Sequence, residues 1–443
     1  MRDVPEEIPD ADSEQVLARV CAIDVAKEFG TVCTRLPSPA GRRSSRVWQV
    51  AATTNAVTDL AAQLVAAEVQ KVTVESTSDY WRIWFYLLEA AGLDVQLVNA
   101  RDVKNVPGRP KTDKLDAVWL AKLTEKGLLR PSFVPPASIR ALRDYTRMRV
   151  DLIRDRTRNL QRMEKLLEDA LIKVTTVASS LRTLSTRDMI EALIRGEHDP
   201  NTLAELARGR MRGKRTALIE ALTGRFKEHH GELARILLDQ IDRLDTQIAH
   251  LSDRIAAVLA EIDPPRPSGD AIPTQDEITV STAWQRLCEI PGISTESAQM
   301  IIAEIGLDMS RFATPAHLVS WARLCPRTIQ SGTSLSAGKA GKGNPYLKGT
   351  LGMAAAAAAR GGDTFLAQRY RRLVKRRGKS KALVAIARSM LVIVWHLLAS
   401  PDARFHDLGA DFHERRVDTT RKTASLVRQL EALGLTVTLQ PTA

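Results

Sequence analysis

The sequence predicts a mixed α/β domain at the N-terminus, a helical coiled-coil region in the middle and a mainly α-helical domain at the C-terminus. Three observations support this order. Short apolar runs rich in β-branched residues precede residue 100. Apolar residues then recur at alternating spacings of three and four, the period of a packed helix. A proline-rich stretch after residue 262 ends that helix.

The N-terminal domain is expected over residues 18–137, after an acidic flexible tail of residues 1–17. Its predicted strands are Val20–Ala26, Thr31–Leu36, Arg46–Ala52, Lys71–Ser76 and Asp94–Ala100. Its predicted helices are Asn55–Ala67, Asp79–Ala91 and Thr112–Lys126, the last with Thr112 as N-cap. Three hairpin-linked strands followed by alternating helices and strands describe the ribonuclease-H-like, or RuvC-like, fold, a mixed sheet with helices on both faces.

The middle region, residues 138–262, is expected to hold two long helices. The first begins near Ser138. The second carries an apolar seam made of Leu237, Ile241, Leu244, Ile248, Leu251, Ile255, Val258 and Ile262. In this heptad pattern, isoleucine occupies every a position and leucine most d positions. This choice favours a parallel coiled coil between two chains. A hairpin against the first helix of the same chain is the alternative.

Residues 263–280 are predicted to be a proline-rich linker, residues 281–408 a mainly helical domain and residues 409–443 an extension without an assigned task. Fifteen Lys or Arg and one acid, Asp363, lie between Trp321 and Ser400, whereas the rest of the chain has 49 basic and 51 acidic residues. A concentrated basic face is typical of proteins that bind a phosphate backbone. A merely solvated basic surface is the alternative.

Composition excludes other classes. The chain has 443 residues, 44% of them hydrophobic, which is enough for two or three cores and excludes wholesale disorder. The longest apolar segment, Leu383–Leu398, is short and contains Arg388, so no membrane span is expected. The N-terminus is acidic, unlike a signal peptide. The four cysteines have no metal-site spacing, so we expect reduced thiols and a cytoplasmic location.

Four acidic residues are candidate metal ligands: Asp24, Glu75, Asp113 and Asp116. Asp24 interrupts an apolar strand, where a lone buried carboxylate costs several kcal/mol. Glu75 ends the fourth strand, which neighbours the first in this fold, and the two later acids share a helix face. Clustered carboxylates repel one another unless cations neutralise them, and their hard oxygens suit Mg²⁺ or Mn²⁺. Each acid alone also fits an ordinary surface position.

A short motif follows the linker. An apolar helix end, then Pro291 and Gly292, then the helix start at Ser294 resemble the turn of helix-hairpin-helix DNA binders. In that motif, backbone N–H groups at a helix N-terminus hold a phosphate. An ordinary helical turn is the alternative.

Ser331 and Gly332 begin a flexible basic segment that could present a hydroxyl beside a phosphate. The segment continues with Lys339, Lys342, Asn344 and Lys348. Serine is a weak nucleophile without activation, and no histidine lies nearby in sequence, so a metal from the acidic site would be the natural activator. A plain turn residue is the alternative.

Together these segments resemble the DEDD transposases of insertion sequences, now described as bridge-RNA-guided recombinases, from about Val20 to Leu398. The resemblance rests on Ile23–Lys27, Glu75 with Tyr80, Lys111–Ala117, Ile290–Gly292, Ser331-Gly332 and Gly343-Asn344. It implies a RuvC-like domain, a coiled-coil connection and a C-terminal transposase domain. Ser78 stands where the family tends to have glycine, and Lys348 where it tends to have arginine, which grips phosphate with two hydrogen bonds.

The resemblance also implies residue roles. Asp24, Glu75, Asp113 and Asp116 would bind Mg²⁺, and Ser331 would be the nucleophile that forms a phosphoserine link to DNA. Dimers and tetramers would assemble around a structured guide RNA that pairs with donor and target DNA. Pro291, Gly292 and the basic segment would contact nucleic acid.

The sequence thus predicts an RNA-guided DNA recombinase of a bacterial mobile element, associated with the nucleoid when bound to DNA. One alternative is a RuvC-like junction nuclease that uses metal-activated water and needs no serine. Another is a coiled-coil nucleic-acid scaffold without enzymatic activity. A tyrosine nucleophile, Tyr346 or Tyr370, is a lesser alternative.

Overall fold

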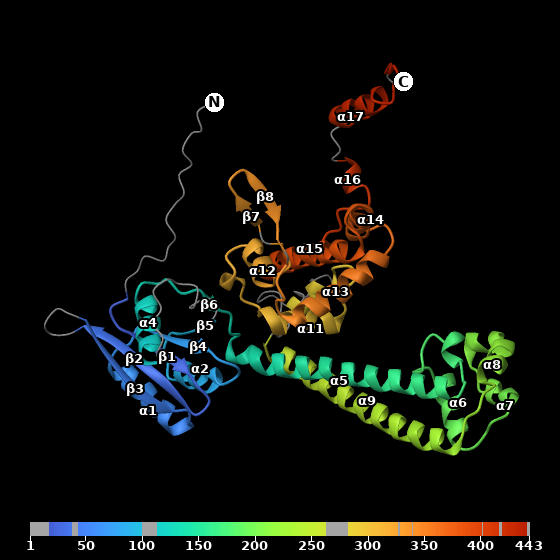
Figure 1. Ribbon diagram of the computed structural model, residues 1–443, viewed down its shortest axis with the longest axis horizontal. Coiled ribbons are helices and arrows are strands. Elements are labelled where there is room, and N and C mark those ends of the chain that lie inside the picture. Colours follow the sequence, from blue (N-terminus) through green and yellow to red (C-terminus); the bar gives the residue numbers. More distant parts are fainter. Residues whose placement is uncertain are drawn as a thin grey trace, which may run out of the picture. The chain divides into compact units, whose positions relative to one another are not determined.

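The computed structural model describes residues 17–37, 43–99, 113–262, 282–326, 328–338, 340–400, 402–415 and 419–440. The chain divides into two compact units, Met1–Val134 and Pro135–Ala443 (Figure 1). The predicted proline-rich linker and nearly all of the predicted acidic tail lie outside the described residues, as do Thr112 and Lys339.

A six-stranded mixed sheet forms the centre of the first unit. Its strands are β1 (Val20–Val25), β2 (Phe29–Pro37), β3 (Arg43–Ala51), β4 (Lys71–Ser76), β5 (Val95–Asn99) and β6 (Pro131–Ser132). The spatial order is β3-β2-β1-β4-β5-β6. β1 pairs antiparallel with β2 and parallel with β4. The expected succession of the first five strands along the chain and the expected place of β4 beside β1 are therefore confirmed, and the short edge strand β6 is additional.

Helices cover both faces of this sheet (Figure 1). They are α1 (Thr54–Ala66), α2 (Trp81–Ala90) and α4 (Asp113–Glu125). Ile23 on one face packs with Leu60 of α1 and Trp84 of α2, whereas Ala22, the adjacent residue of β1, packs on the opposite face with Leu120 of α4. Successive residues of a strand point to opposite faces. Each residue of β1 therefore faces either the layer of α1 and α2 or the layer of α4.

Two long helices form the first part of the second unit: α5 (Ala137–Asp169) and α9 (Glu228–Ile262). They pack against each other within one chain, the alternative that the sequence left open. Arg156 contacts Asp245, and Arg149 donates to Ser252 at 3.5 Å. A step of seven residues forward in one helix therefore matches seven backward in the other, and the helices are antiparallel.

The buried seam of α9 is offset from the predicted one. Ile241 and Ile255 are buried as predicted, and they are joined by Leu238 and Leu259. The predicted partners Leu244 and Leu251 are only half-buried. The buried positions of α9 therefore match the predicted seam only in part.

Small helices join α5 to α9 and were not anticipated individually. They are η1 (Val174–Thr176), α6 (Leu184–Ile194), α7 (Pro200–Glu205), η2 (Gly209–Lys214) and α8 (Arg215–Leu222). Met189, Leu203 and Leu218 pack with Met163 of α5 and Leu238 of α9 in one core. This core closes the far end of the helical hairpin.

The C-terminal domain is mainly helical, as expected, with one β-hairpin that the sequence did not predict. Its elements are α10 (Ala283–Cys288), α11 (Thr295–Ile305), η3 (Met309–Arg311), α12 (Pro315–Trp321), β7 (Thr328–Ser331), β8 (Ser334–Ala337), α13 (Pro345–Arg360), α14 (Phe365–Arg377) and α15 (Lys379–Ala399). Two further helices, α16 (Phe412–Arg415) and α17 (Thr419–Glu431), follow.

α15 is the central helix of this domain. This 21-residue helix is long enough and apolar enough to cross a membrane by length and composition alone. Ile386, Met390 and Val394 are fully buried, and the helix packs against α12, α13 and α14. A core helix accounts for this pattern, so its hydropathy is weak evidence for a membrane span.

Candidate active site and nucleic-acid surface

Asp24 and Glu75 lie at matching positions on neighbouring parallel strands. The register pairs Ala22 with Thr73 and Ile23 with Val74, so the next residues along β1 and β4 are the two acids. Adjacent strands of a sheet are about 4.8 Å apart. The two carboxylates therefore start from neighbouring backbone positions at the carboxyl ends of their strands.

Both acids face the layer formed by α4. Asp24 has the same strand parity as Ala22, which packs on α4, and Glu75 has the parity of Thr73. The Thr124 hydroxyl of α4 donates to Thr73 Oγ1 at 2.7 Å. Glu75 is only 5% exposed, and Asp24 is half-buried. A buried carboxylate on a sheet needs compensating partners.

The direction of α4 carries Asp116 toward the same end of the sheet. Leu17 N donates to Glu125 O at 2.9 Å, and Arg35 forms an ion pair with Glu125 at 2.5 Å, which fixes the end of α4 at the start of β1. Asp116 lies nine residues earlier, about 13 Å along the helix. Asp24 lies about 13 Å along β1 from Val20.

Three of the four predicted acids are thus brought to one end of the sheet. Asp116 is half-buried on the layer that covers it. Asp113 begins α4, but its side chain lies outside the described part of the structure. Each of the three described acids already takes part in an interaction, so none is a free carboxylate. Carboxylate oxygens at this end of the sheet are of the type that divalent cations prefer.

Ser331 lies in the second unit, at the tip of the β7–β8 hairpin. It is the last residue of β7 and pairs with Ser334, the first residue of β8. Gly332 lies in the turn with a φ of +56°, a backbone conformation that residues other than glycine rarely adopt. Ser331 is exposed, so the hairpin presents its hydroxyl at a protruding tip.

The turn at Pro291 and Gly292 packs against helix α13. A Cβ on Gly292 would lie 2.8 Å from the Ala358 amide nitrogen and closer still to the Ala354 carbonyl oxygen. The six alanines of α13 therefore admit a close helix–turn contact. Ser294 caps α11 by accepting from Ser297 N and also donates to the Glu296 carboxylate at 2.8 Å. These contacts give the motif a packing role, and phosphate binding there stays a prediction.

Asn344 also has a structural role. Its side-chain oxygen accepts from Tyr346 N at 2.9 Å and so caps α13, and its amide nitrogen donates to Glu304 at 2.5 Å. Lys348 Nζ donates to the Gly341 carbonyl at 2.9 Å, whereas Lys342 is exposed. Of the predicted basic contacts in this segment, Lys342 is the one that faces solvent among the described residues.

Two segments of the chain match known transposase domains. Residues 21–172 match the DEDD transposase domain of IS110, and residues 284–371 match the transposase domain of the IS116/IS110/IS902 family. The chain belongs to the IS110 transposase family. The two matches flank the α6–α8 region and include both the three described acids and Ser331.

Two relatives agree with this assignment. The chain is 25% identical over 320 residues to a probable family 20 transposase of Pseudomonas aeruginosa, covering 71% of this chain and 80% of the relative. It is 29% identical over 122 residues to the IS110 insertion element 43.6 kDa protein of Streptomyces coelicolor, covering 27% and 29% of the two chains. The family implies an enzyme that cleaves and recombines DNA.

Tyr346 of this transposase is held in place by its neighbours. Its hydroxyl donates to Asp151 Oδ2 at 2.8 Å, and the guanidinium groups of Arg147 and Arg154 lie 4.9 and 5.2 Å from the ring centre. Burial and then Asp151 raise the pKa of Tyr346. A raised pKa disfavours the phenolate, so these contacts weigh against Tyr346 as a nucleophile.

A basic surface runs over the junction of α14 and α15. Its exposed residues are Arg371, Arg372, Lys375, Arg376, Arg377, Lys379 and Lys381. Within the described part of the chain, Arg371 alone of these seven forms an ion pair, with Asp363 at 3.8 Å. The other charges are available to phosphates, as the family's action on DNA requires.

One group of potential ligands was missed by the sequence reasoning. Asp169, His229 and His230 have ligand atoms within 4.8 Å of one another. However, His230 Nδ1 accepts from Lys227 N at 2.9 Å, and His230 Nε2 lies 3.1 Å from Asp169 Oδ2. Both ring nitrogens are therefore engaged, and the group is better explained as a cap at the start of α9. Residues on separate helices gave no sequence signal.

Proposed function

We propose that this transposase is an RNA-guided DNA recombinase that joins itself covalently to DNA through Ser331. The observation that carries the proposal is the matched register of Asp24 and Glu75 on the face covered by α4. Asp24, Glu75, Asp113 and Asp116 would hold Mg²⁺, with Mn²⁺ as a substitute. When bound, such ions stabilise the charge on attacking and leaving oxygens of a phosphodiester.

The protein's own contribution is to position the reacting groups. The rigid strands β1 and β4 hold two acids at adjacent places, and α4 brings the third. In the proposed reaction, the Ser331 oxygen forms a bond to the scissile phosphorus while a P–O bond to the adjoining sugar breaks. The ester retains the reactivity of the phosphodiester, so a second DNA end can displace the serine.

Nucleic acid would bind to two parts of the C-terminal domain. The seven exposed charges at the α14–α15 junction fit the phosphate backbone of donor and target DNA or of a guide RNA. Pro291 and Gly292, with Gly332, Lys339, Lys342, Asn344 and Lys348, remain proposed contacts. Lys348 and Asn344 also stabilise the segment around α13.

Several chains would be needed for strand exchange. The acids belong to the first unit and Ser331 to the second, so an active site shared between two protomers is part of the proposal. The half-buried Leu244 and Leu251 of α9 would pair protomers as dimers and tetramers.

The test separates this proposal from its alternatives. The RNA that copurifies with the full-length protein is sequenced, and labelled donor and target DNA are designed from it. The wild type with Mg²⁺ should yield protein-linked DNA on a denaturing gel. Ser331→Ala should abolish the link, whereas Ser334→Ala, at the paired position of the same hairpin, should keep it. Asp24→Asn should abolish cleavage. Asp59→Asn, which changes an exposed residue of α1, should not.

Other results favour the alternatives. Cutting by Ser331→Ala at the wild-type rate indicates a RuvC-like nuclease that uses water. Binding without any Mg²⁺-dependent cleavage in the wild type indicates a scaffold. Protein-linked DNA from Ser331→Ala would assign the nucleophile to another residue.

A further inference from the structure

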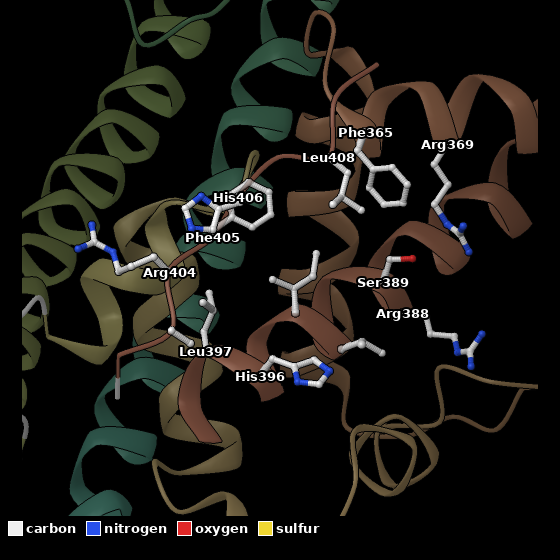
Figure 2. A pocket seen from close by; sticks show the side chains of 13 residues that line it. Phe365, Arg369, Arg388, Ser389, His396, Leu397, Arg404, Phe405, His406 and Leu408 are labelled. Atoms are coloured by element: carbon white, nitrogen blue, oxygen red, sulfur yellow. The ribbon is translucent and has the colours of Figure 1, made fainter. Parts of the chain in front are cut away.

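A pocket of about 540 Å³ lies between α14, α15 and the segment of residues 403–408 (Figure 2). Its size falls within the range of about 300–1,000 Å³ that is usual for small-ligand sites. Neither the proposed acidic ligands nor Ser331 are among its lining residues. No sequence motif pointed to it, because its walls come from three segments of the chain.

The wall formed by residues 403–408 is fixed at both ends. Arg404 forms an ion pair with Glu289 at 2.6 Å, and Phe405 N donates to the same carboxylate at 2.9 Å. Asp407 accepts from Phe365 N at 3.0 Å and from Gly409 N at 2.8 Å. The wall is therefore attached to the end of α10 on one side and to the start of α14 on the other.

Positive charge gathers at one end of the pocket. Arg369 of α14 and Arg388 of α15 both line it, and Figure 2 shows their guanidinium groups on the same side. Arg369 Nε is buried and has no hydrogen-bond partner among the described residues. Burial, followed by Arg372 and Arg388, lowers the pKa of Arg369. An anion bound here would accept a hydrogen bond from Arg369 Nε and reduce the repulsion between Arg369 and the neighbouring arginines.

The rest of the lining combines apolar and aromatic side chains with Ser389, His396 and Arg404. Leu397, Val392 and Ile393 of α15 line it, and Phe405 and His406 come from the opposite segment. Flat rings beside an apolar surface suit a nucleobase, because base–aromatic stacking is worth about 1–3 kcal/mol and tolerates any base. A purely apolar ligand would leave the arginines unpaired.

We propose that this pocket binds one unstacked nucleotide, with its phosphate at Arg369 and Arg388 and its base between α15 and Phe405. This inference rests on the nucleic-acid binding proposed above, because the pocket adjoins the basic surface of α14 and α15. The nucleotide would come either from a displaced DNA strand or from the guide RNA. Both sources offer a phosphate and a base, and they differ in the 2′-hydroxyl of the sugar.

The probe is a short single-stranded oligonucleotide containing 5-iodouracil, made once as DNA and once as RNA, with full-length protein. Ultraviolet crosslinking followed by peptide mapping should place the crosslink at Phe405 or His406. Thymidine or uridine monophosphate should compete for this crosslink better than inorganic phosphate. The nucleic acid with the higher yield identifies the source.

Three variants test the pocket itself. Ile393→Trp fills it without changing charge, and Arg369→Ala removes its anion contact; each should reduce the pocket crosslink at least ten-fold. Arg360→Ala removes an equal charge from an exposed position at the end of α13, outside the basic surface, and should keep the crosslink at the same position. Direct mapping in the wild type does not depend on whether a variant folds.

The two proposals fail in different ways. Oligonucleotide binding with crosslinks confined to the exposed arginines and lysines overturns the pocket and leaves the basic surface intact. An undiminished pocket crosslink in Ile393→Trp also overturns it. No binding of either oligonucleotide by the wild type refutes the proposed nucleic-acid surface as well.

Discussion

Ser78 adopts a backbone conformation that favours glycine. Its φ of +47° lies in the left-handed region. A side chain in this conformation costs about 1–2 kcal/mol relative to glycine, partly offset by the greater freedom of glycine in the unfolded chain. We predict that Ser78→Gly raises the free energy of unfolding by about 0.5–1 kcal/mol, measured by urea denaturation. Ser78→Ala keeps the Cβ and should give no gain, and a loss of stability in Ser78→Gly contradicts the account.

Residue by residue, the sequence was most informative where a polar side chain broke a regular pattern. Asp24 and Glu75 could be found because each interrupts or ends an apolar strand, and the strand period then set their face. Arg369 and Arg388 could not be found in this way. Arginines in a basic block look alike until the fold shows which of them lines a pocket.

At the scale of elements, Glu304 joins three helices. It is fully buried on α11 and contacts Arg147 of α5 at 2.7 Å and Asn344 at the start of α13. We predict that Glu304→Ala destabilises the second unit by about 3–5 kcal/mol, because it leaves a partly buried guanidinium without its partner. Chemical denaturation measures the loss.

The matched control is the double variant Arg147→Ala with Glu304→Ala. It should lose less stability than the sum of the two single variants, because each single variant already removes the Arg147–Glu304 ion pair. Strict additivity would show that the two groups do not interact energetically. Glu304→Gln, which retains hydrogen-bonding groups, should fall between the wild type and Glu304→Ala.

Long, periodic elements were predictable and short ones were not. β4 was predicted at its observed bounds, and the helices of the first unit within two residues, because apolar runs and turn residues mark them. The β7–β8 hairpin escaped because four-residue strands of mostly polar residues carry no burial pattern. The choice between a dimeric coiled coil and an intrachain hairpin depended on α5, whose polar seam residues Arg149 and Asn159 obscured its periodicity.

At the scale of the whole molecule, two compact units should unfold in two steps, and a divalent cation should affect one of them. Because the proposed ligands all lie in the first unit, we predict that Mg²⁺ or Mn²⁺ raises the midpoint of that unit's thermal transition. The shift should grow with the logarithm of the metal concentration above the dissociation constant. Differential scanning calorimetry of the full chain, with and without EDTA, measures both transitions.

The variant Asp24→Asn shows which thermal transition belongs to the first unit and also tests whether Asp24 is a metal ligand. Without metal, it should raise the midpoint of the first unit, because removing one carboxylate relieves repulsion among the clustered acids. With metal, it should lose the shift that the wild type shows, while the transition of the second unit stays unchanged. Asp59→Asn, an exposed acid of the same unit, should behave as the wild type. A metal shift of wild-type size in Asp24→Asn, or one confined to the second unit, would mean that the cation binds elsewhere and that the acids of β1 and β4 serve another purpose.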